Sequence, residues 1–335
     1  MKKQWIFQGV TAALAAFFLG GTLAVGASSG WYGLEELASS GKGEDQWPYQ
    51  YTSTWDPAVS EVDGLNIQWG GGPVKVTPTD GPLVTVTEYA STPLEEEQQL
   101  SLSSSRGVLE ITWDDGLLPL GGFSGPEKRL EIQVPQDILS QLEELSCWSL
   151  TGDVTLGPLA AEKVEVTTSL GDVSLSGVQG KSVRLTAVSG DVLLAGGTAE
   201  ELFVQTDSGA MGINSMEAKK CHLKSVTGSV FYGESRAEEF TVETVTGPVL
   251  TRLENCPETA DLRSVSGDIT LGLRENNGFD AAYSSVSGHF SSEFAGSHSK
   301  GTLRYGKGGG KLSMTTTWGD IKLSRVTGAY AQTTS

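Results

Sequence analysis

The amino-acid sequence predicts an all-β fold, a parallel β-solenoid with about 19 residues per coil and a hydrophobic helix at the amino terminus. Three observations support this prediction. One glycine returns at a fixed interval, apolar and polar residues alternate on both sides of it, and long helical patterns are absent from the sequence beyond the amino terminus. The repeated pattern runs from Leu145 to about Val326 in the setting Ser/Thr-Gly-Asp-Val/Ile-x-Leu.

The recurring glycine sets the period of the repeat. Five consecutive steps of 19 residues are followed by one step of 20 and one of 21, and a fixed period of this size is typical of a repeat protein. Positions are counted from this glycine, where a positive φ or a close backbone approach is expected. The repeat glycines are Gly152, Gly171, Gly190, Gly209, Gly228, Gly247, Gly267 and Gly288.

Alternation on each side of the glycine predicts two short strands with one buried face. Positions +2 and +4 are mostly apolar, as in Val173 and Leu175, and so are positions −7 and −5, as in Val183 and Leu185. The buried phase changes between the two strands, which requires a corner. Position −2 is also apolar in most repeats, which predicts that this corner lies between −5 and −2. The residues concerned are Leu150, Val188, Val226, Val245, Val265 and Val286.

Two short strands cannot bury their own apolar face, but stacked coils can. Parallel coils about 4.8 Å apart would place equal repeat positions side by side, so Val173 and Val192 should be neighbours on the same side of the wall. A β-sandwich is the second possibility. Its strands would have no reason to keep a 19-residue phase.

The amino-terminal segment predicts export. Residues 1–27 begin with Lys2 and Lys3, continue through the apolar run Trp5–Val25 and end in small residues, as expected for a signal peptide or a transmembrane anchor. Because the lysines stay inside, both interpretations place the rest of the chain outside the cytoplasm, either membrane-anchored or secreted.

The remaining chain divides into three segments. Residues 28–59 form a linker whose aromatic side chains either lie at a membrane interface or pack on the first coil, and we favour packing. Residues 60–146 are expected to form an amino-terminal cap and the first irregular strands, because a solenoid needs atypical terminal coils. A helical turn is expected over 138–145. Residues 147–330 form the regular repeats, with Thr317–Ile321 as the last good copy.

Composition excludes one large class of partner. The 335 residues include 41 acidic and 23 basic side chains, a net charge of −18. Nucleic acids select cationic surfaces, so no nucleic-acid partner is expected.

Three aspartates fall at the same position of adjacent coils and are the metal candidates. Asp153, Asp172 and Asp191 would form a carboxylate ladder that binds Ca²⁺, although neighbouring pairs repel by roughly 1 kcal/mol in water. The favoured alternative is that each aspartate accepts hydrogen bonds from the amides of its own turn. No cofactor is expected.

The cysteines, histidines and two tryptophans are further candidates. Cys147 and Cys221 occupy inward positions four coils apart, too far for a disulfide, and Cys256 lies outside both strands. His222 should point outward. No pair among His222, His289 and His298 has metal-ligand spacing. Outward Trp148 and Trp113 would either bind a glycan or partner, or be covered by a loop, and we favour the cover.

The segment Leu130-Glu-Ile-Gln-Val-Pro135, followed within twenty residues by the first Ser/Thr-x-Gly-Asp-Val/Ile-x-Leu unit, resembles the bacterial putative adhesin family, also called domain of unknown function 4097. The resemblance covers roughly residues 60–330. It implies a β-strand-repeat solenoid, an envelope location and no known catalytic residues, and relatives are linked with cell-envelope stress responses. The aspartate that follows the glycine in the family pattern is replaced at Ala210, Ser229, Pro248 and His289.

These observations together predict a non-enzymatic, extracytoplasmic adhesin or cell-envelope scaffold. The expected partners are the membrane, through the apolar segment, and a surface glycan or envelope protein. One alternative is a stress-response component that binds a membrane partner. Another is a carbohydrate-active enzyme on a β-helix, which would need acidic residues clustered on one face.

Overall fold

A computed structural model describes residues 48–55, 62–113 and 126–326 of the chain. The chain divides into residues 1–43 and residues 44–335, and every described residue belongs to the second unit. The predicted amino-terminal helix, over residues 1–27, lies outside the described residues. Within the described ranges, no helix is both long enough and apolar enough to cross a bilayer.

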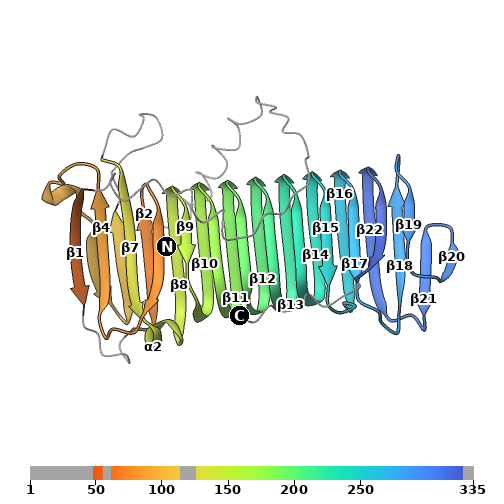
Figure 1. Ribbon diagram of the computed structural model, residues 1–335, viewed down its shortest axis with the longest axis horizontal. Helices are drawn as coiled ribbons and strands as arrows, with labels where there is room; N and C mark the ends of the chain where they lie inside the picture. The colour runs from red at the N-terminus through yellow and green to blue at the C-terminus, as the bar shows by residue number, and fades with distance from the viewer. Residues whose placement is uncertain (1–47, 56–61, 114–125, 327–335) are drawn as a thin grey trace, which may run out of the picture. The chain divides into compact units, whose positions relative to one another are not determined.

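The described chain is almost entirely β-strand, and its central strands are parallel with a register of 19 residues (Figure 1). Strands β11 (Val173–Ser189), β12 (Val192–Ser208), β13 (Met211–Thr227) and β14 (Val230–Thr246) each pair with the next along their length. Val173 pairs with Val192, and both side chains are fully buried. The predicted neighbourhood of residues 19 apart is therefore confirmed.

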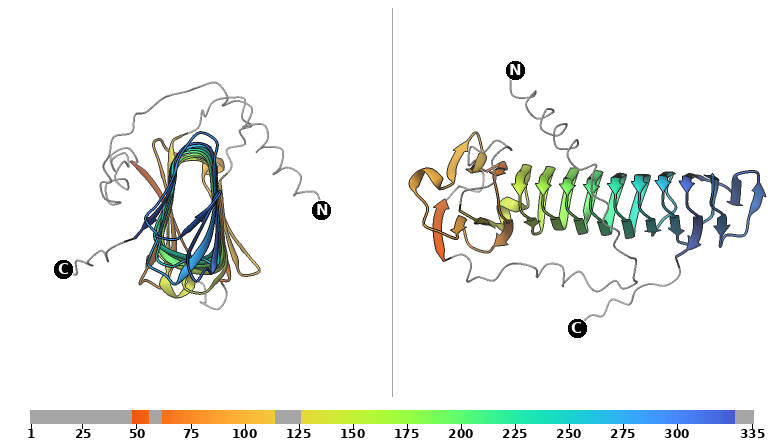
Figure 2. Two further views of the ribbon diagram at one scale, coloured as in Figure 1. Left: turned by 90° about the vertical axis from the view of Figure 1, so that its right-hand side faces the viewer. Right: turned by 90° about the horizontal axis from the view of Figure 1, so that it is seen from above.

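Each regular coil contains three straight stretches around one apolar core (Figure 2). The first runs from the repeat glycine to a corner at position +6, where φ is positive in Gly177, Gly196, Ser215 and Glu234. A short second stretch buries Val178. The third returns to the next glycine and buries residues such as Val183. We call the outer surface of this third stretch the long face.

The predicted corner between positions −5 and −2 is wrong, because the strand continues to the glycine. Position −3 is buried in every regular coil and is occupied by small residues such as Ala187, Thr206 and Ser225. Position −2 points outward, and Val245 is 45% exposed. Hydrophobic patterning missed position −3 because its hydroxyl residues are polar. Thr206 Oγ1 and Thr316 Oγ1 donate hydrogen bonds of 3.0 and 3.1 Å to the carbonyl oxygens of Gly190 and Gly267. The hydroxyl groups of Thr168, Ser225, Thr244 and Ser264 at the same position are buried without a hydrogen-bond partner among the described residues.

The repeat glycines form a ridge along one edge of the stack, which we call the glycine edge. Their φ values lie between 109° and 159° from Gly152 to Gly267, a region that side chains rarely adopt. A Cβ on Gly190 would lie 2.0 Å from the carbonyl oxygen of Gly171 in the preceding coil. Glycine is therefore required both for the corner and for the spacing between coils.

The amino-terminal layers are not stacked in chain order. Strand β2 (Gly64–Trp69) lies between β6 (Val108–Trp113) and β8 (Leu142–Thr151), parallel to both. Strand β3 (Val74–Thr79) lies in the same way between β7 (Lys128–Pro135) and β9 (Val154–Leu156). The first complete layer of the chain is thus the second layer of the stack.

The carboxyl-terminal layers show the same exchange. Strand β22 (Gly310–Trp318) lies between β16 (Thr259–Ser266) and β18 (Gly278–Ser285). Gly319 therefore lies next to Gly267, and Gly288 lies one layer further out. Gly288 follows Gly267 as the next repeat glycine along the chain, at an interval of 21 residues. In the stack the two are separated by the layer of Gly319, because β22 inserts between β16 and β18.

The other strands of this end follow the same layers. Strand β23 (Ile321–Arg325) lies between β17 (Ile269–Leu273) and β19 (Phe290–Ser292). Strands β10 (Leu159–Leu170) and β15 (Val249–Leu253) complete the parallel ladder.

Antiparallel strands close both ends of the stack. At the amino-terminal end β5 (Ser101–Ser105) pairs with β6, β4 (Val84–Ala90) pairs with β7, and β1 (Tyr49–Trp55) pairs with β4. Strand β1 places part of the predicted linker on the cap. At the other end β21 (Thr302–Gly306) pairs with β18, and β20 (Ser297–Ser299) with β21.

Helical structure in the described chain is limited to two short turns. These are η4 (Glu96–Gln98) and α2 (Gln136–Leu139). The helical turn expected over 138–145 is displaced, because β8 already begins at Leu142 and its side chains continue the core.

Candidate binding surface

The three predicted metal candidates bond to the neighbouring coil. Asp153 Oδ1 accepts a hydrogen bond of 2.9 Å from the amide of Asp172, and Asp172 Oδ1 accepts one of 2.7 Å from the amide of Asp191. Asp191 Oδ1 accepts one of 2.7 Å from the amide of Ala210. The favoured alternative expected each aspartate to accept hydrogen bonds from its own turn. The carboxylates instead accept them from the next coil. Each carboxylate therefore ties two layers together at the glycine edge.

This arrangement also perturbs the central carboxyl group. The pKa of Asp172 is raised, first by partial withdrawal from water and then by the negative charges of Asp153 and Asp191, while the amide of Asp191 opposes the shift. In the described part of the chain, no three His, Cys, Asp or Glu side chains are grouped closely enough to hold a metal ion. One carboxylate oxygen of each aspartate is occupied by a backbone amide.

The cysteines are free thiols. Cys147 and Cys221 are fully buried, and burial raises the pKa of Cys147 to about 12 and that of Cys221 further still. Cys256 is half-buried, and burial raises its pKa as well. Thiols with raised pKa values are weak nucleophiles and weak metal ligands at neutral pH.

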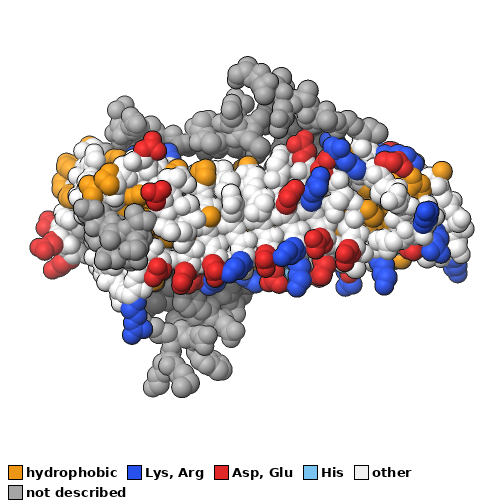
Figure 3. All heavy atoms as spheres, turned by 90° about the horizontal axis from the view of Figure 1, so that it is seen from below, with side chains coloured by type: hydrophobic (Ala, Val, Ile, Leu, Met, Phe, Trp, Pro, Cys, Tyr) orange, Lys and Arg blue, Asp and Glu red, His pale blue; other side chains and the backbone are white. Residues whose placement is uncertain are grey.

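A belt of ion pairs follows the corner opposite the glycine edge, at positions −8 to −11 (Figure 3). Its members pair with a residue 19 positions away in the adjacent coil. The pairs are Glu144 with Lys163, Glu162 with Lys181, Glu200 with Lys219, Glu201 with Lys220, and Glu217 with Arg236. Because these side chains are mostly exposed, water screens each pair and each adds little to stability. The belt fixes charge order between layers more than it adds stability.

A mixed row of side chains at position −6 stands on the long face next to the belt. The Arg184 guanidinium lies 4.0 Å from the ring centre of Phe203, and the His222 ring meets Phe203 edge-on at 5.3 Å. His222 Nε2 also lies 4.0 Å from a Glu243 carboxylate oxygen. Arg184, Phe203 and His222 line an open depression of about 320 Å³, together with Glu201 and Lys220. His222 points outward as predicted.

Apolar residues are exposed in a row along the long-face side of the glycine edge. Val226, Val245 and Val265 occupy position −2 of three adjacent layers and are 41%, 45% and 49% exposed. Trp318, at position −1 of the next layer, is 60% exposed, and Val286 in the layer beyond is 77% exposed. We call these five residues the apolar row. Contiguous exposed apolar side chains on a polar surface mark contact sites.

The remaining sequence candidates do not join these features. Trp148 points outward but is half-buried, and Trp113 is buried against Trp69 with ring centres 4.9 Å apart. His289 lies on the glycine edge, 3.7 Å from Asp320, and is 94% exposed. His298 lies in β20, 6.4 Å from the Phe290 ring.

A buried ion pair in the amino-terminal cap has no counterpart in the sequence analysis. Lys128 Nζ donates a 2.6 Å hydrogen bond to Glu88, and both side chains are almost completely buried. The same ammonium group lies 3.8 Å from the ring centre of Trp113 and also bonds the carbonyl oxygen of Gln98. Glu88 additionally accepts the amide of Leu100 at 3.1 Å. The pair joins β4 and β7 to the connection before β5, which is a structural role.

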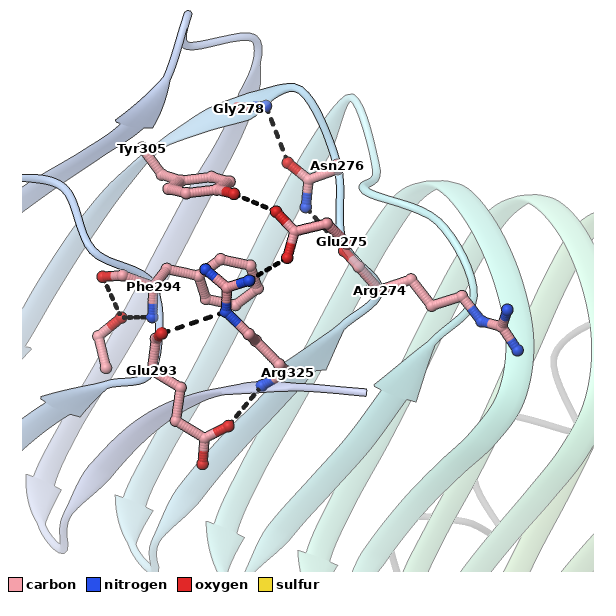
Figure 4. Close-up of polar contacts among 9 residues, drawn as sticks. Arg274, Glu275, Asn276, Gly278, Glu293, Phe294, Tyr305 and Arg325 are labelled. Carbon is pink, nitrogen blue, oxygen red and sulfur yellow. Dashed lines mark hydrogen bonds and ion pairs between the residues drawn. The ribbon is translucent and has the colours of Figure 1, made fainter. Parts of the chain in front are cut away.

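A second polar cluster holds the carboxyl-terminal layers together (Figure 4). Arg325 pairs with Glu275, and its backbone amide donates to Glu293 Oε2 at 2.9 Å. The guanidinium stacks 4.7 Å from the ring centre of Phe294, and the Tyr305 hydroxyl also donates to Glu275. The hydrogen bond that the backbone amide of Arg325 donates is the largest cause of the lowered pKa of Glu293. The cluster links β23 to the loops beside β18 and β19.

The sequence indicated the residues of these two surface rows only in part. Val226, Val245 and Val265 are visible as a periodic set, but their hydrophobicity suggested an inward direction. Arg184, Phe203 and His222 differ in type, so no residue type recurs at position −6 in the sequence. The row follows from the 19-residue register once position −6 is known to point outward.

The fold and surface define a capped parallel β-solenoid whose outer wall presents ordered rows of side chains. The chain belongs to the Toastrack DUF4097 family, whose model matches residues 62–324. The resemblance predicted from the sequence is thereby confirmed. No curated protein matches the chain at a significant level.

Several solved structures are similar to the chain. A putative adhesin from Bacteroides fragilis is 16% identical, with 84% of this chain and 99% of that chain covered and a TM-score of 0.41. A putative adhesin from Parabacteroides merdae is 8% identical, with 84% and 97% covered and a TM-score of 0.42. A putative lipid binding protein from Parabacteroides distasonis is 14% identical, with 84% and 98% covered and a TM-score of 0.39.

Proposed function

We propose that the chain is an exported, non-enzymatic protein that binds its partner along the outer wall of the solenoid, as an adhesin or a cell-envelope scaffold. The row of Arg184, Phe203 and His222 carries this proposal. An aromatic ring fixed between two cationic or hydrogen-bonding groups, in an open depression, suits a ligand too large for an enclosed pocket. A surface polysaccharide or an envelope protein is such a ligand.

The arrangement of the carboxylates supports binding rather than hydrolysis. Glycoside hydrolysis uses two carboxyl groups that face each other across the substrate, roughly 5 to 10 Å apart. The belt carboxylates described above are instead paired with lysine or arginine of the adjacent coil, as Glu201 is with Lys220. Those at the glycine edge, such as Asp172, accept backbone amides.

Export is the part of the proposal that rests on the amino-terminal sequence. Lys2 and Lys3 precede the apolar run Trp5–Val25, which fits a cleaved signal or an uncleaved anchor. Mass spectrometry of the mature amino terminus in separated membrane and medium fractions distinguishes the two. A full-length chain found only in the cytoplasm would contradict export.

Binding is tested with the full chain and a panel of immobilised neutral and anionic polysaccharides. We expect at least one of them to retain the wild-type chain and the Phe203→Ser variant to lose most of that retention. Leu193→Ser is the matched control, because Leu193 is a half-buried apolar residue that points outward from the opposite face. Equal loss in both variants, or no retention of the wild type, would refute the proposal. Release of new reducing ends from a bound polysaccharide would refute its non-enzymatic part.

The stress-response alternative predicts a role for the segment before the solenoid. Deleting residues 31–47 leaves β1 intact, and β1 begins at Tyr49. If the deletion abolished an envelope-stress response but left polysaccharide retention unchanged, the alternative would be preferred.

A further inference from the structure

The apolar row contains most of the large exposed hydrophobic residues of the described chain. Seven large hydrophobic residues are exposed in the described chain, and five of them form the apolar row: Val226, Val245, Val265, Trp318 and Val286. They occupy five consecutive layers, since β13, β14, β16, β22 and β18 follow one another in the stack. At about 4.8 Å per layer the row is roughly 19 Å long.

Charge is distributed unevenly along the stack, and the apolar row lies in its near-neutral part. Residues 219–326 contain 13 Lys or Arg and 12 Asp or Glu, whereas residues 62–218 contain 7 and 23. The acidic excess of the whole chain is therefore concentrated before the apolar row. A second macromolecule of the same charge pattern can approach the row closely only if its own acidic part points away.

We propose that the apolar row is the contact between two copies of this chain, packed antiparallel about a two-fold axis. A ladder of side chains every 4.8 Å matches another stack of parallel strands layer by layer. One apolar stripe of an α-helix repeats about every 5.2 Å, and one face of a single strand about every 6.8 Å, so both lose register along the row. An antiparallel pair overlaps the two near-neutral parts and keeps the acidic parts at opposite ends.

The charges beside the row select one register. With the two-fold axis between the layers of Val245 and Val265, each Val245 faces the partner's Val265. Glu243 then faces the partner's Arg263, an attractive pair, because both lie at position −4 on the same side of the row. A shift by one layer toward β22 would place Asp268 against the partner's Asp320, which repel. A shift of the axis by one layer the other way would leave only Val226 and Val245 against the partner's apolar row, whereas the proposed register keeps Val226, Val245, Val265 and Trp318 against it. Shifts of half a layer would place Arg263 against the partner's Arg263, or Glu243 against the partner's Glu243, and both pairs repel.

The contact is small, which limits its strength. A row of this length and two side chains wide covers on the order of 300 to 400 Å² per copy, against about 800 Å² for a stable complex. Association is therefore expected to be weak in solution, roughly micromolar to millimolar. It becomes substantial where copies share a surface, because confinement raises their effective concentration.

The test is disulfide capture in the full chain, with Cys256→Ser as background. In the proposed register Val226 faces the partner's Thr317, whereas the two Val226 residues are three layers apart, about 14 Å. Disulfides need Cα atoms within about 7 Å. A mixture of the Val226→Cys and Thr317→Cys chains, differently tagged, should form the mixed dimer at least ~10-fold faster than either chain forms its own.

Two lysine substitutions supply a matched pair. Val245→Lys places two unpaired charges at the centre of the contact and should slow the capture at least ~10-fold. Val286→Lys should leave it unchanged or faster, because Val286 faces the partner's Asp207 in this register. Far-ultraviolet circular dichroism checks that both variants keep the strand content of the wild type.

Three outcomes would overturn the proposal. Fast self-capture by the Val226→Cys chain would show a parallel contact. Equal effects of the two lysine substitutions would remove the register. Capture no faster than for a pair on the opposite face, combined with Val245-dependent sedimentation with phosphatidylcholine vesicles, would assign the row to a lipid surface. None of these results depends on polysaccharide retention, so failure here leaves the proposed function standing.

Discussion

Replacing Gly190 by alanine tests the claim that the glycine edge sets the spacing of the coils. Gly190 has a φ of 151° and follows Gly171 in the stack. A Cβ at position 190 would lie 2.0 Å from the carbonyl oxygen and 2.5 Å from the carbonyl carbon of Gly171. Both atoms are backbone, so no side-chain rotation relieves the overlap. The two layers have to separate at this corner.

The cost follows from the hydrogen bonds that such a separation stretches. Ordinary contact begins at 3.4 Å, so the layers would move apart by about 1.4 Å. The bonds from Gly171 N to Ser189 O, 3.0 Å, and from Val173 N to Asp191 O, 2.9 Å, join these two layers beside this corner. Losing two or three such bonds costs about 2 to 3 kcal/mol, and the positive φ adds about 1 to 2 kcal/mol. We expect Gly190→Ala to destabilise the coil by about 3 to 5 kcal/mol.

Gly196→Ala separates the two contributions. Gly196 has a φ of 74°, but a Cβ there would meet no atom within 4 Å. It therefore carries the backbone penalty of about 1 to 2 kcal/mol without the overlap. The difference between the two variants, about 2 to 3 kcal/mol, measures the stacking requirement at the glycine edge.

Hydrogen exchange resolved by coil is the appropriate assay, because a stack of this kind can open locally and need not unfold as one unit. We expect Gly190→Ala to lower protection most in residues 171–209 and less in distant coils. Urea unfolding followed by circular dichroism supplies the global value. Equal destabilisation by the two variants would refute the argument, since the Cβ overlap would then have no energetic effect.

Substitutions in three polar contacts give further tests. Asp172→Asn should leave stability at pH 7 unchanged or higher, because it keeps an acceptor for the Asp191 amide and removes a carboxyl group whose pKa is raised in the fold. A raised pKa means that the ionised carboxylate destabilises the folded wild type, and this cost is relieved as the pH falls through the folded pKa. Asp172→Ala removes the acceptor and should lose about 1 kcal/mol in urea unfolding. Millimolar Ca²⁺ should leave the melting temperature unchanged, and a rise that Asp172→Ala abolishes would restore the metal hypothesis. Lys128→Met should cost about 3 to 5 kcal/mol in the same assay by leaving Glu88 buried without its cation, and adding Glu88→Gln should recover part of it. Arg325→Lys should increase exchange in β23, because lysine cannot keep the guanidinium stacking, and no change would contradict the role of this cluster.

The 19-residue register could be predicted because it depends on a residue that has no substitute. Gly171 and Gly190 lie where a side chain would overlap the backbone of the neighbouring coil, so glycine recurs at this position of the sequence. The buried phase of Val173 and Leu175 was predictable for a similar reason, since both side chains are buried in the apolar core. Both are local demands that each coil repeats.

The position of the corner could not be predicted from hydrophobicity. Thr206 is buried while Val226 is exposed, the reverse of what their side chains suggest. A small hydroxyl residue fits beneath the tight corner and can bond a carbonyl oxygen of the adjacent coil, as Thr206 does. An exposed valine has no such local explanation. Its recurrence on the outer wall is the reason that the apolar row is better understood as a contact surface than as part of the core.

The candidate surface was predictable only as far as single positions. The sequence placed Asp153, Asp172 and Asp191 in one ladder, and the structure keeps them there while assigning their oxygens to backbone amides. The neighbours Arg184 and Phe203 are 19 residues apart and unlike in type. Their contact depends on the register and the outward direction together.

The exchanged layers at the carboxyl-terminal end bear on how copies of the chain can meet. Strand β22 pairs over seven residues with β16 on one side and seven with β18 on the other, so fraying of the terminal strands requires two ladders to open. The outermost strands are instead β19 and β20, of three residues each, and short edges give little backbone for another chain to extend. End-to-end growth is thereby disfavoured at this end. The flank of the same layers, where the apolar row lies, is left as the surface through which two stacks can associate.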